Sequence, residues 1–234
     1  MKLIFIRHGE PDYEHDTLTP KGWREAELLS NRISKLNVRD FYCSPLGRAK
    51  DTASLTLKKM GRTATVLDWL QEVPKSVTDP ETGKKHVPWD FMPDFWTVQG
   101  DLYDKDKWFK NHIMVEGNVG GTYRKVSEEL DTLLRSYGYS RSGMFYRTED
   151  GNCDTIVFFC HLGVTCLMLS HLIGIAAPVL WQGFFLAPTS VTTVETEERK
   201  KGEAFFRCKS FGDVSHLYVA GEPVSDSGFF NEMY

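Results

Sequence analysis

Short apolar segments alternate with segments of helical periodicity along this chain, and that alternation narrows the choice of fold most. Four segments are predicted to be buried strands, namely Lys2–Ile6, Asp40–Cys43, Thr63–Trp69 and Asp154–Cys160. Helical patterns follow the first, second and fourth of them. Strands that alternate with helices are typical of a doubly wound sheet whose strands run mostly parallel. We therefore expect an α/β protein.

The predicted helices begin with recognisable capping residues. Thr19 followed by Pro20 has the pattern of an N-cap and a first helical residue, and Ser44-Pro45 repeats it at the start of a helix to about Met60. A third helix is predicted over Leu162–Ile173, directly after the fourth strand. The predicted apolar face of the first helix is Ala26, Leu29, Ile33 and Leu36.

Three segments depart from the alternation. Val73–Gly121 is rich in aromatic residues, prolines and lysines, and we expect an insertion there, followed by a helix carrying Val126 and Leu130. Such an insertion either packs its aromatic side chains on the core or forms a cap over a site, with some of Lys75, Lys84 and Lys85 facing an anionic substrate. Gly143–Asp154 suits a small hairpin. Thr189–Glu195 and Ala204–Ser210 are expected to pair as an antiparallel hairpin at a sheet edge.

Length and composition set the broad class. The chain has 234 residues and a formal charge of −4, so it can bury a large core and has no global basic field for nucleic acid. Its five cysteines are odd in number and lack C-x-x-C spacing, which argues against a disulfide framework and a zinc knuckle. No apolar run is long enough to span a bilayer, and the amino terminus reads as a strand without leader features. We expect a cytoplasmic protein that uses neither nucleic acid nor membrane as a partner.

The first strand runs directly into Arg7-His8-Gly9-Glu10. In open α/β folds ligands bind at the carboxyl edge of the sheet, where these residues emerge. A guanidinium group matches phosphate oxygens, and a neutral imidazole is a competent nucleophile toward phosphorus. The tetrapeptide alone is equally consistent with an ordinary strand end, so it needs partners elsewhere.

Three further side chains are predicted to reach the same edge. Arg48 lies one turn into the second helix, Glu72 follows the third strand, and His161 follows the fourth. Two arginines and His161 could hold phosphoryl oxygens while His8 attacks, and Glu72 could protonate the leaving alkoxide. Such a site needs no metal or other cofactor, because cationic side chains take the place of Mg²⁺. A metal site of His161 and His171 is disfavoured, since the two do not share a helix face.

The motifs and their order resemble the histidine phosphatase superfamily, on its phosphoglycerate-mutase-like branch. They are R-H-G-E at 7–10, L-T-P-K-G at 18–22 with E-A at 25–26, S-P-L-G-R-A at 44–49 with T-A at 52–53, and His161. The resemblance implies a three-layer α/β/α sandwich with a mostly parallel central sheet, forming one domain over 1–234 with a cap insertion at about 73–121. It also implies that His8 is phosphorylated, that Arg7, Arg48 and His161 bind the phosphate, and that Glu72 is the proton donor.

Two departures from the family pattern bear on activity. Only seven residues separate Glu10 from Leu18, where mutases of this branch have a longer loop, and Val73-Pro74-Lys75 replaces the usual segment after the acid. We therefore expect a phosphatase acting on a small phosphorylated metabolite. A mutase and a phospholigand-binding protein without catalysis are the alternatives, Glu116 is the alternative acid, and homodimerisation is left open.

Overall fold

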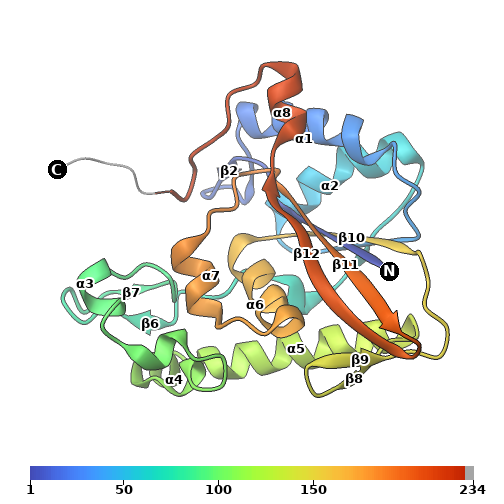
Figure 1. The fold of residues 1–234 in the computed structure, drawn as a ribbon. Coiled ribbons are helices and arrows are strands. Elements are labelled where there is room, and N and C mark those ends of the chain that lie inside the picture. Colours follow the sequence, from blue (N-terminus) through green and yellow to red (C-terminus); the bar gives the residue numbers. More distant parts are fainter. Residues whose placement is uncertain (230–234) are drawn as a thin grey trace.

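The computed structural model describes residues 1–229, and its centre is an eight-stranded sheet (Figure 1). The strand order is β5-β4-β10-β1-β11-β12-β9-β8. Strands β5 to β1 run parallel, and the remaining pairs are antiparallel. The parallel strands are β1 (Lys2–Arg7), β4 (Asp40–Cys43), β5 (Thr65–Val66) and β10 (Thr155–Cys160). The α/β fold with a parallel half is as predicted.

The antiparallel half is made by two hairpins. Strands β11 (Val191–Lys200) and β12 (Glu203–Asp213) form a long one, and β8 (Ser140–Ser142) and β9 (Phe145–Arg147) form a short one beside it. The long hairpin was predicted in place but too short. The short one turns at Gly143 and Met144, so the prediction of a hairpin over Gly143–Asp154 put it several residues too late. Gly143 has a φ of +63°, which this tight turn requires and which glycine adopts without strain.

Helices cover both faces of the sheet and give the molecule three layers. On one face, α1 (Pro20–Ile33) and α2 (Gly47–Met60) enclose the side chains of Ile4, Ile6, Val157 and Phe159. On the other, α5 (Val119–Ser136), α6 (Leu162–Ile173) and α7 (Ala177–Gly183) cover Leu3, Phe5, Ile156 and Phe158. Successive side chains of a strand point to opposite faces, so the fully apolar strands β1 and β10 are buried between both layers. A last helix, α8 (Ser215–Ala220), packs on α1.

The helix starts only partly follow the prediction. Thr19 caps α1 as expected, its hydroxyl accepting the N–H of Gly22, and Pro20 is the first helical residue. Helix α2 begins at Gly47 instead of Pro45, and Ser44 does not cap it. Leu36 lies beyond the end of α1 and is 36% exposed, so it is not part of that helix's buried face. The predicted strand Thr63–Trp69 shrinks to β5 and a 3₁₀ turn at Asp68–Leu70.

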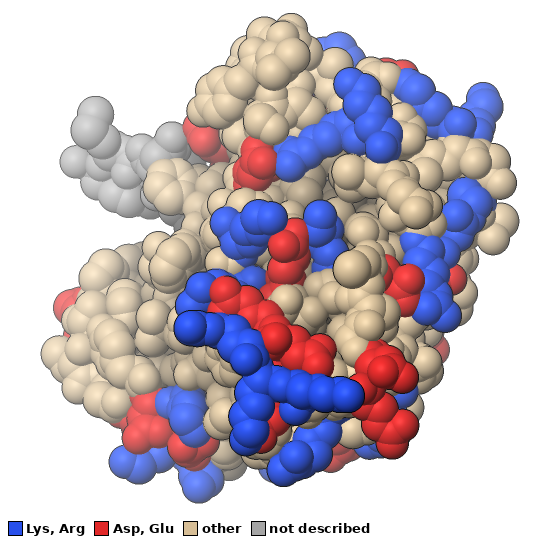
Figure 2. Space-filling view, turned by 45° about the vertical axis from the view of Figure 1, so that its right-hand side comes forward, with Lys and Arg blue, Asp and Glu red and all other residues tan. Residues whose placement is uncertain are grey.

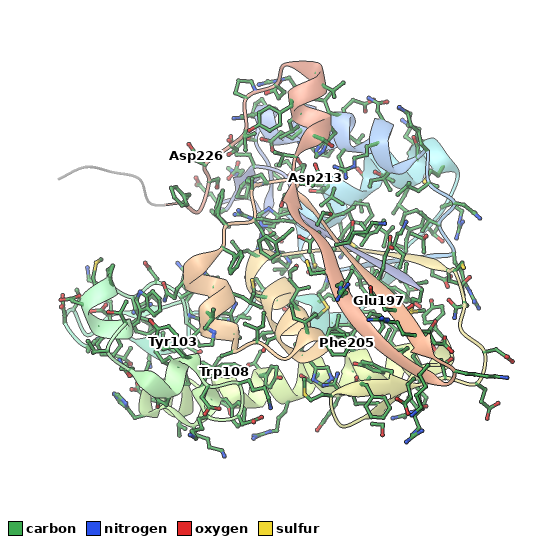
Figure 3. The ribbon with its side chains drawn as sticks, viewed as in Figure 1. Tyr103, Trp108, Glu197, Phe205, Asp213 and Asp226 are labelled. Atoms are coloured by element: carbon green, nitrogen blue, oxygen red, sulfur yellow. The ribbon has the colours of Figure 1, made fainter. Side chains whose placement is uncertain are left out.

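The segment between the third strand and α5 forms a small layer of its own beside α7 (Figure 1, green). Its short elements are β6 (Val77–Thr78), β7 (Lys85–His86), α3 (Pro93–Trp96), 3₁₀ turns at Gly100–Tyr103 and Trp108–Lys110, and α4 (His112–Glu116). Trp108 is fully buried and stands edge-on to Trp181 of α7, with ring centroids 5.6 Å apart (Figure 3). Two further short strands, β2 (Pro11–Asp12) and β3 (Thr17–Leu18), form a ribbon before α1.

Charges of opposite sign are interleaved on the face that bears the β11–β12 hairpin (Figure 2). Arg207 pairs with Glu197 at 2.8 Å, and Lys209 and Lys2 both lie within 3.2 Å of Glu195. Charge on this face is therefore locally balanced. Among residues 1–229, no helix is long and apolar enough to cross a membrane.

Candidate active site

His8 follows β1 directly, and its side chain is almost completely buried. Its Nδ1 lies 2.7 Å from the carbonyl oxygen of Gly9. A carbonyl oxygen only accepts hydrogen bonds, so Nδ1 carries the proton in this contact and the lone pair resides on Nε2. The backbone therefore selects the tautomer in which Nε2 can act as a nucleophile.

His161 is held beside His8 because the two follow neighbouring parallel strands. Arg7 is in register with Cys160, and the His8 N–H donates to the Cys160 carbonyl at 3.0 Å. The two imidazole centroids are 5.1 Å apart. The Nε2 of His161 lies 2.8 Å from the hydroxyl oxygen of Ser44, which follows the next parallel strand, β4. Three adjacent strand ends thus fix the positions of both rings.

Both histidines are held in their neutral forms. Burial lowers the pKa of His8 well below its usual value, and the nearby charges of Arg7, His161 and Arg48 lower it further. The pKa of His161 is also lowered, first by burial and then by Arg48 and Arg7. A neutral imidazole keeps the lone pair that nucleophilic attack requires. Two arginines beside two neutral histidines leave the site with a positive charge suited to an anion.

Arg48 reaches this edge from the first turn of α2, where Asp16 holds it. The Arg48 Nη1 donates to Asp16 Oδ1 at 2.6 Å, and the Gly47 N–H donates to Asp16 Oδ2 at the same distance. Burial would raise the pKa of Asp16, but these two donors together lower it. Tyr13 covers the guanidinium, whose carbon is 5.4 Å from the ring centroid. The loop between β2 and β3 therefore both caps α2 and orients Arg48.

Arg7 is buried and bonded to two carbonyl oxygens far along the chain. Its Nη1 donates to Leu186 at 2.5 Å and its Nη2 to Ser227 at 2.9 Å. The guanidinium carbon also lies 5.7 Å from the ring centroid of Phe185. The segment before residue 229 is thereby drawn across this side of the site.

Glu72 lies at the amino end of α6. Its carboxylate accepts the N–H groups of Gly163 and Val164, each at 3.1 Å, and that of Val73 at 2.9 Å. Burial raises the pKa of Glu72, although those three N–H groups and Arg7 oppose the rise. Gly163 is required here, because a Cβ would collide with both the Glu72 carboxylate and the ring of Trp89. The acid is thus fixed directly beside His161.

Glu116, the alternative acid, lies elsewhere. It is at the surface of the insertion, where its carboxylate accepts from the Thr78 hydroxyl and pairs with Lys85 at 3.0 Å. Those contacts lower its pKa, so it is a poor proton donor. Lys85 is engaged in this pair and Lys84 is exposed. Of the aromatic side chains in the insertion, Trp89 is the one placed against Glu72 and Gly163.

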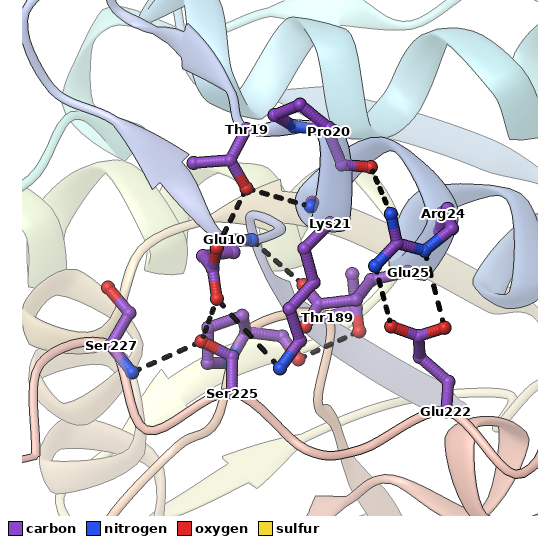
Figure 4. Close-up of polar contacts among 12 residues, drawn as sticks. Glu10, Thr19, Pro20, Lys21, Arg24, Glu25, Thr189, Glu222, Ser225 and Ser227 are labelled. Atoms are coloured by element: carbon purple, nitrogen blue, oxygen red, sulfur yellow. Dashed lines mark hydrogen bonds and ion pairs between the residues drawn. The ribbon is translucent and has the colours of Figure 1, made fainter.

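A polar network lies under the first turn of the site (Figure 4). The Glu10 carboxylate accepts from the Thr19 hydroxyl at 2.8 Å and from the Ser225 hydroxyl at 2.6 Å. The Glu10 N–H donates to the buried carboxylate of Glu25 at 2.9 Å. Burial raises the pKa of Glu25 to about 7, against the effect of that N–H. This network ties the turn after His8 to α1 and to the segment containing Ser225.

The structure thus brings Arg7, His8, Arg48, Glu72 and His161 to one edge of the sheet, in the arrangement that the sequence analysis predicted. Sequence reasoning missed Asp16, Ser44 and Glu25, which hold three of these groups or their backbone. Ser44 was assigned to a helix cap, and Asp16 was one of several polar residues in a loop. Neither had a local signal for its partner.

Comparison with known proteins agrees with this geometry. Residues 3–85 match the profile of the "Histidine phosphatase superfamily (branch 1)". A 2,3-bisphosphoglycerate-dependent phosphoglycerate mutase of Thermoplasma acidophilum is 38% identical over 66 residues, which are 24% of this chain and 33% of the mutase. The mitochondrial serine/threonine-protein phosphatase Pgam5 of Caenorhabditis elegans is 23% identical over 92% of this chain and 63% of its own length. The chain thus spans less than two thirds of either relative.

Solved structures extend the likeness to most of the fold. A phosphoserine phosphatase mutant of Entamoeba histolytica in complex with phosphoserine superposes with a TM-score of 0.62. The two chains are 22% identical, and the match covers 92% of this one and 98% of the other. The profile match supplies the motifs around His8 and Arg48, and the superposition supplies the sheet and its two helical layers. Taken together, they identify this chain as a member of the histidine phosphatase superfamily.

Proposed function

We propose that the protein is a phosphatase that hydrolyses a small phosphomonoester through a phosphohistidine on His8. The observation that carries this proposal is the buried pair of neutral imidazoles, His8 and His161, between Arg7 and Arg48. The names of the relatives agree with it, since the similar structure above is a phosphoserine phosphatase. All five cysteines are free thiols, which suits a reducing compartment such as the cytoplasm.

The first step transfers the phosphoryl group to the enzyme. The Nε2 lone pair of His8 forms a bond to phosphorus as the bond from phosphorus to the ester oxygen breaks. The departing alkoxide takes a proton from the Glu72 carboxyl group, whose raised pKa favours the protonated form that can donate. Arg7, Arg48 and His161 bind the phosphoryl oxygens and stabilise the charge that builds on them.

The second step returns the enzyme to its starting state. Water gives a proton to the Glu72 carboxylate while its oxygen bonds to phosphorus. The bond between phosphorus and Nε2 breaks, and inorganic phosphate leaves with His8 neutral again. Among residues 1–229, Nε of Arg7, Nε of Arg48 and Nδ1 of His161 are buried without a hydrogen-bond partner. Such groups are costly unless they are paired, which supports an anion-binding role for these three side chains.

The test is a search for phosphohistidine. A substrate labelled on phosphorus should transfer acid-labile label to the wild-type protein and release inorganic phosphate. His8→Ala should lose both while keeping its fold, and the exposed His112→Ala should lose neither. Label that persists on His8→Ala would contradict the proposal. Label recovered mainly in an organic acceptor would indicate a mutase, and binding without label would indicate a phospholigand-binding protein.

A further inference from the structure

An aromatic cavity of about 320 Å³ adjoins the candidate active site. It is lined by residues from three segments that lie far apart in the sequence. The insertion contributes Trp89, α6 and α7 contribute Leu162 and Trp181, and the chain after α7 contributes Phe184 and Phe185. The remaining lining residues are Gln182, Gly183, Gly228 and Phe229. Five of these nine residues are aromatic.

The cavity is continuous with the residues assigned to phosphate binding. Phe185 lines it and also stacks against Arg7, 5.7 Å from the guanidinium carbon. Leu162 follows His161 directly in the chain. Trp89 packs on Gly163 next to the Glu72 carboxylate. A phosphomonoester held by Arg7 and His161, with its ester oxygen toward Glu72, would therefore direct its alcohol part to this cavity.

The chemistry of the lining selects an uncharged, flat group. Among the nine lining residues none has a charged side chain, and Gln182 carries the one free polar head. The indole N–H of Trp181 is already used, because it donates to the Gly163 carbonyl at 3.1 Å. Trp89 and Trp181 are tilted by 41° with centroids 5.5 Å apart, and Phe185 and Phe229 by 59° at 5.1 Å. Tilted walls of this kind offer edges and faces to a further aromatic ring.

We propose that this cavity binds a neutral aromatic group in the alcohol part of the substrate, joined to the phosphate by a short linker. The inference rests on the proposed phosphatase function, and it adds the class of substrate. A carboxylate or ammonium group, such as phosphoserine carries, would find no counter-charge among the lining residues. The cavity volume is at the small end for ligand sites, so a single ring system fits it best.

The experiment compares substrates whose leaving groups differ little in basicity. The value of kcat/KM for 2-phenylethyl phosphate should exceed that for ethyl phosphate by about 30-fold or more, since placing a ring in an apolar pocket gives more than one methylene does. O-phosphoserine should be a poor substrate. Phe184→Ala and Trp89→Leu should each reduce the ratio of phenylethyl to ethyl phosphate by about tenfold.

The matched control is Phe205→Ala. Phe205 is a partly exposed phenylalanine on the β11–β12 hairpin, away from α7 (Figure 3), and its loss should leave the ratio unchanged. A ratio near one in the wild type, a preference for O-phosphoserine, or an unchanged ratio in both cavity variants would overturn the proposal.

Failure of the phosphatase function would look different. No inorganic phosphate would then be released from any of the three substrates. Calorimetric binding of 2-phenylethylphosphonate and ethylphosphonate still decides the cavity in that case. Tighter binding of the aromatic phosphonate, lost in Phe184→Ala, supports an aromatic site, and equal affinities reject it.

Discussion

Asp16 holds Arg48 by a hydrogen-bonded ion pair of 2.6 Å between Oδ1 and Nη1. The same carboxylate accepts the Gly47 N–H through its other oxygen. Asp16 is 43% exposed at its side chain and Arg48 only 12%. An ion pair with one partner this exposed contributes little to overall stability. Its main effect is therefore to fix the direction of a buried guanidinium group at the site.

Asp16→Asn should reduce activity more than stability. The amide oxygen can still accept the Gly47 N–H, but the charge that orients Arg48 is lost. We expect kcat/KM to fall by roughly 10- to 100-fold, the usual cost of losing an outer contact that positions a binding group. The melting temperature should change by only a few degrees. Asp12→Asn, in the same loop, is the control, and a large loss of stability with unchanged kcat/KM would contradict the role of Asp16.

Arg48→Lys should not rescue the function of Arg48. A lysine ammonium is a point charge and cannot reproduce the planar fork that binds two oxygens at once. The loss of transition-state stabilisation should reach about 3 kcal/mol, or about 100-fold in kcat/KM. Arg39→Lys, at the surface beside Asp154, should leave the rate unchanged. Activity close to wild type in Arg48→Lys would argue strongly against phosphate binding by this side chain.

Local sequence patterns located the strand ends but not the contacts between distant segments. Arg7, His8 and His161 could be placed because each follows an apolar strand, and parallel strands end at a common edge. Ser44 was misassigned because its serine-proline pattern fits a helix cap, whereas its hydroxyl contacts His161, 117 residues away. Asp16 supplies the contact to α2 instead. Local propensity carries no information about such partners.

The aromatic cavity was equally hidden in the sequence. Its walls come from residue 89, from 162, from 181–185 and from 228–229, so no single segment reveals it. The insertion was expected to supply an aromatic wall and cationic side chains. Trp89 does line the cavity, but Trp108 and Phe91 are buried in the core. Each aromatic residue looks alike in sequence, and only packing decides which remain accessible.

Glu25 should make the protein less stable as the pH rises. Its pKa is raised by burial from an ordinary value of 4.5 to about 7. A raised carboxyl pKa stabilises the fold below pH 4.5, and this contribution is lost as the pH rises through about 7. A shift of this size corresponds to about 3 kcal/mol. Glu25→Gln removes the titration, so it should be more stable than the wild type at about pH 8 and similar to it near pH 4.5.

The measurement is urea unfolding of both proteins from about pH 4.5 to about pH 8, a range that spans the two pKa values. The glutamine of the Glu25→Gln variant retains an oxygen for the Glu10 N–H, so the backbone contact is preserved. Glu27→Gln, on the exposed side of the same helix, controls for the loss of one negative charge. A stability difference between wild type and Glu25→Gln that is independent of pH would show that Glu25 does not titrate in this range.

Glu72→Gln should slow substrates according to their leaving groups. An alkyl phosphate leaves as a strongly basic alkoxide and needs a proton in the transition state, whereas p-nitrophenolate departs without one. The loss should be roughly 10²- to 10⁴-fold for an alkyl phosphate and much smaller for p-nitrophenyl phosphate. The glutamine can still accept N–H groups of Gly163 and Val164, so the start of α6 should keep its structure.

The pH profile gives an independent reading of the same carboxyl group. His8 must be neutral to attack, and its lowered pKa places that limb at acid pH. Glu72 must be protonated to donate, so kcat/KM for alkyl phosphates should fall as the pH rises past its raised pKa. Glu72→Gln should lose this falling limb, and p-nitrophenyl phosphate should show little of it in the wild type. Glu116→Gln, which removes a surface carboxylate paired with Lys85, should behave as wild type. Equal losses on both substrates in Glu72→Gln, or a leaving-group-dependent loss in Glu116→Gln instead, would remove Glu72 from the role of proton donor.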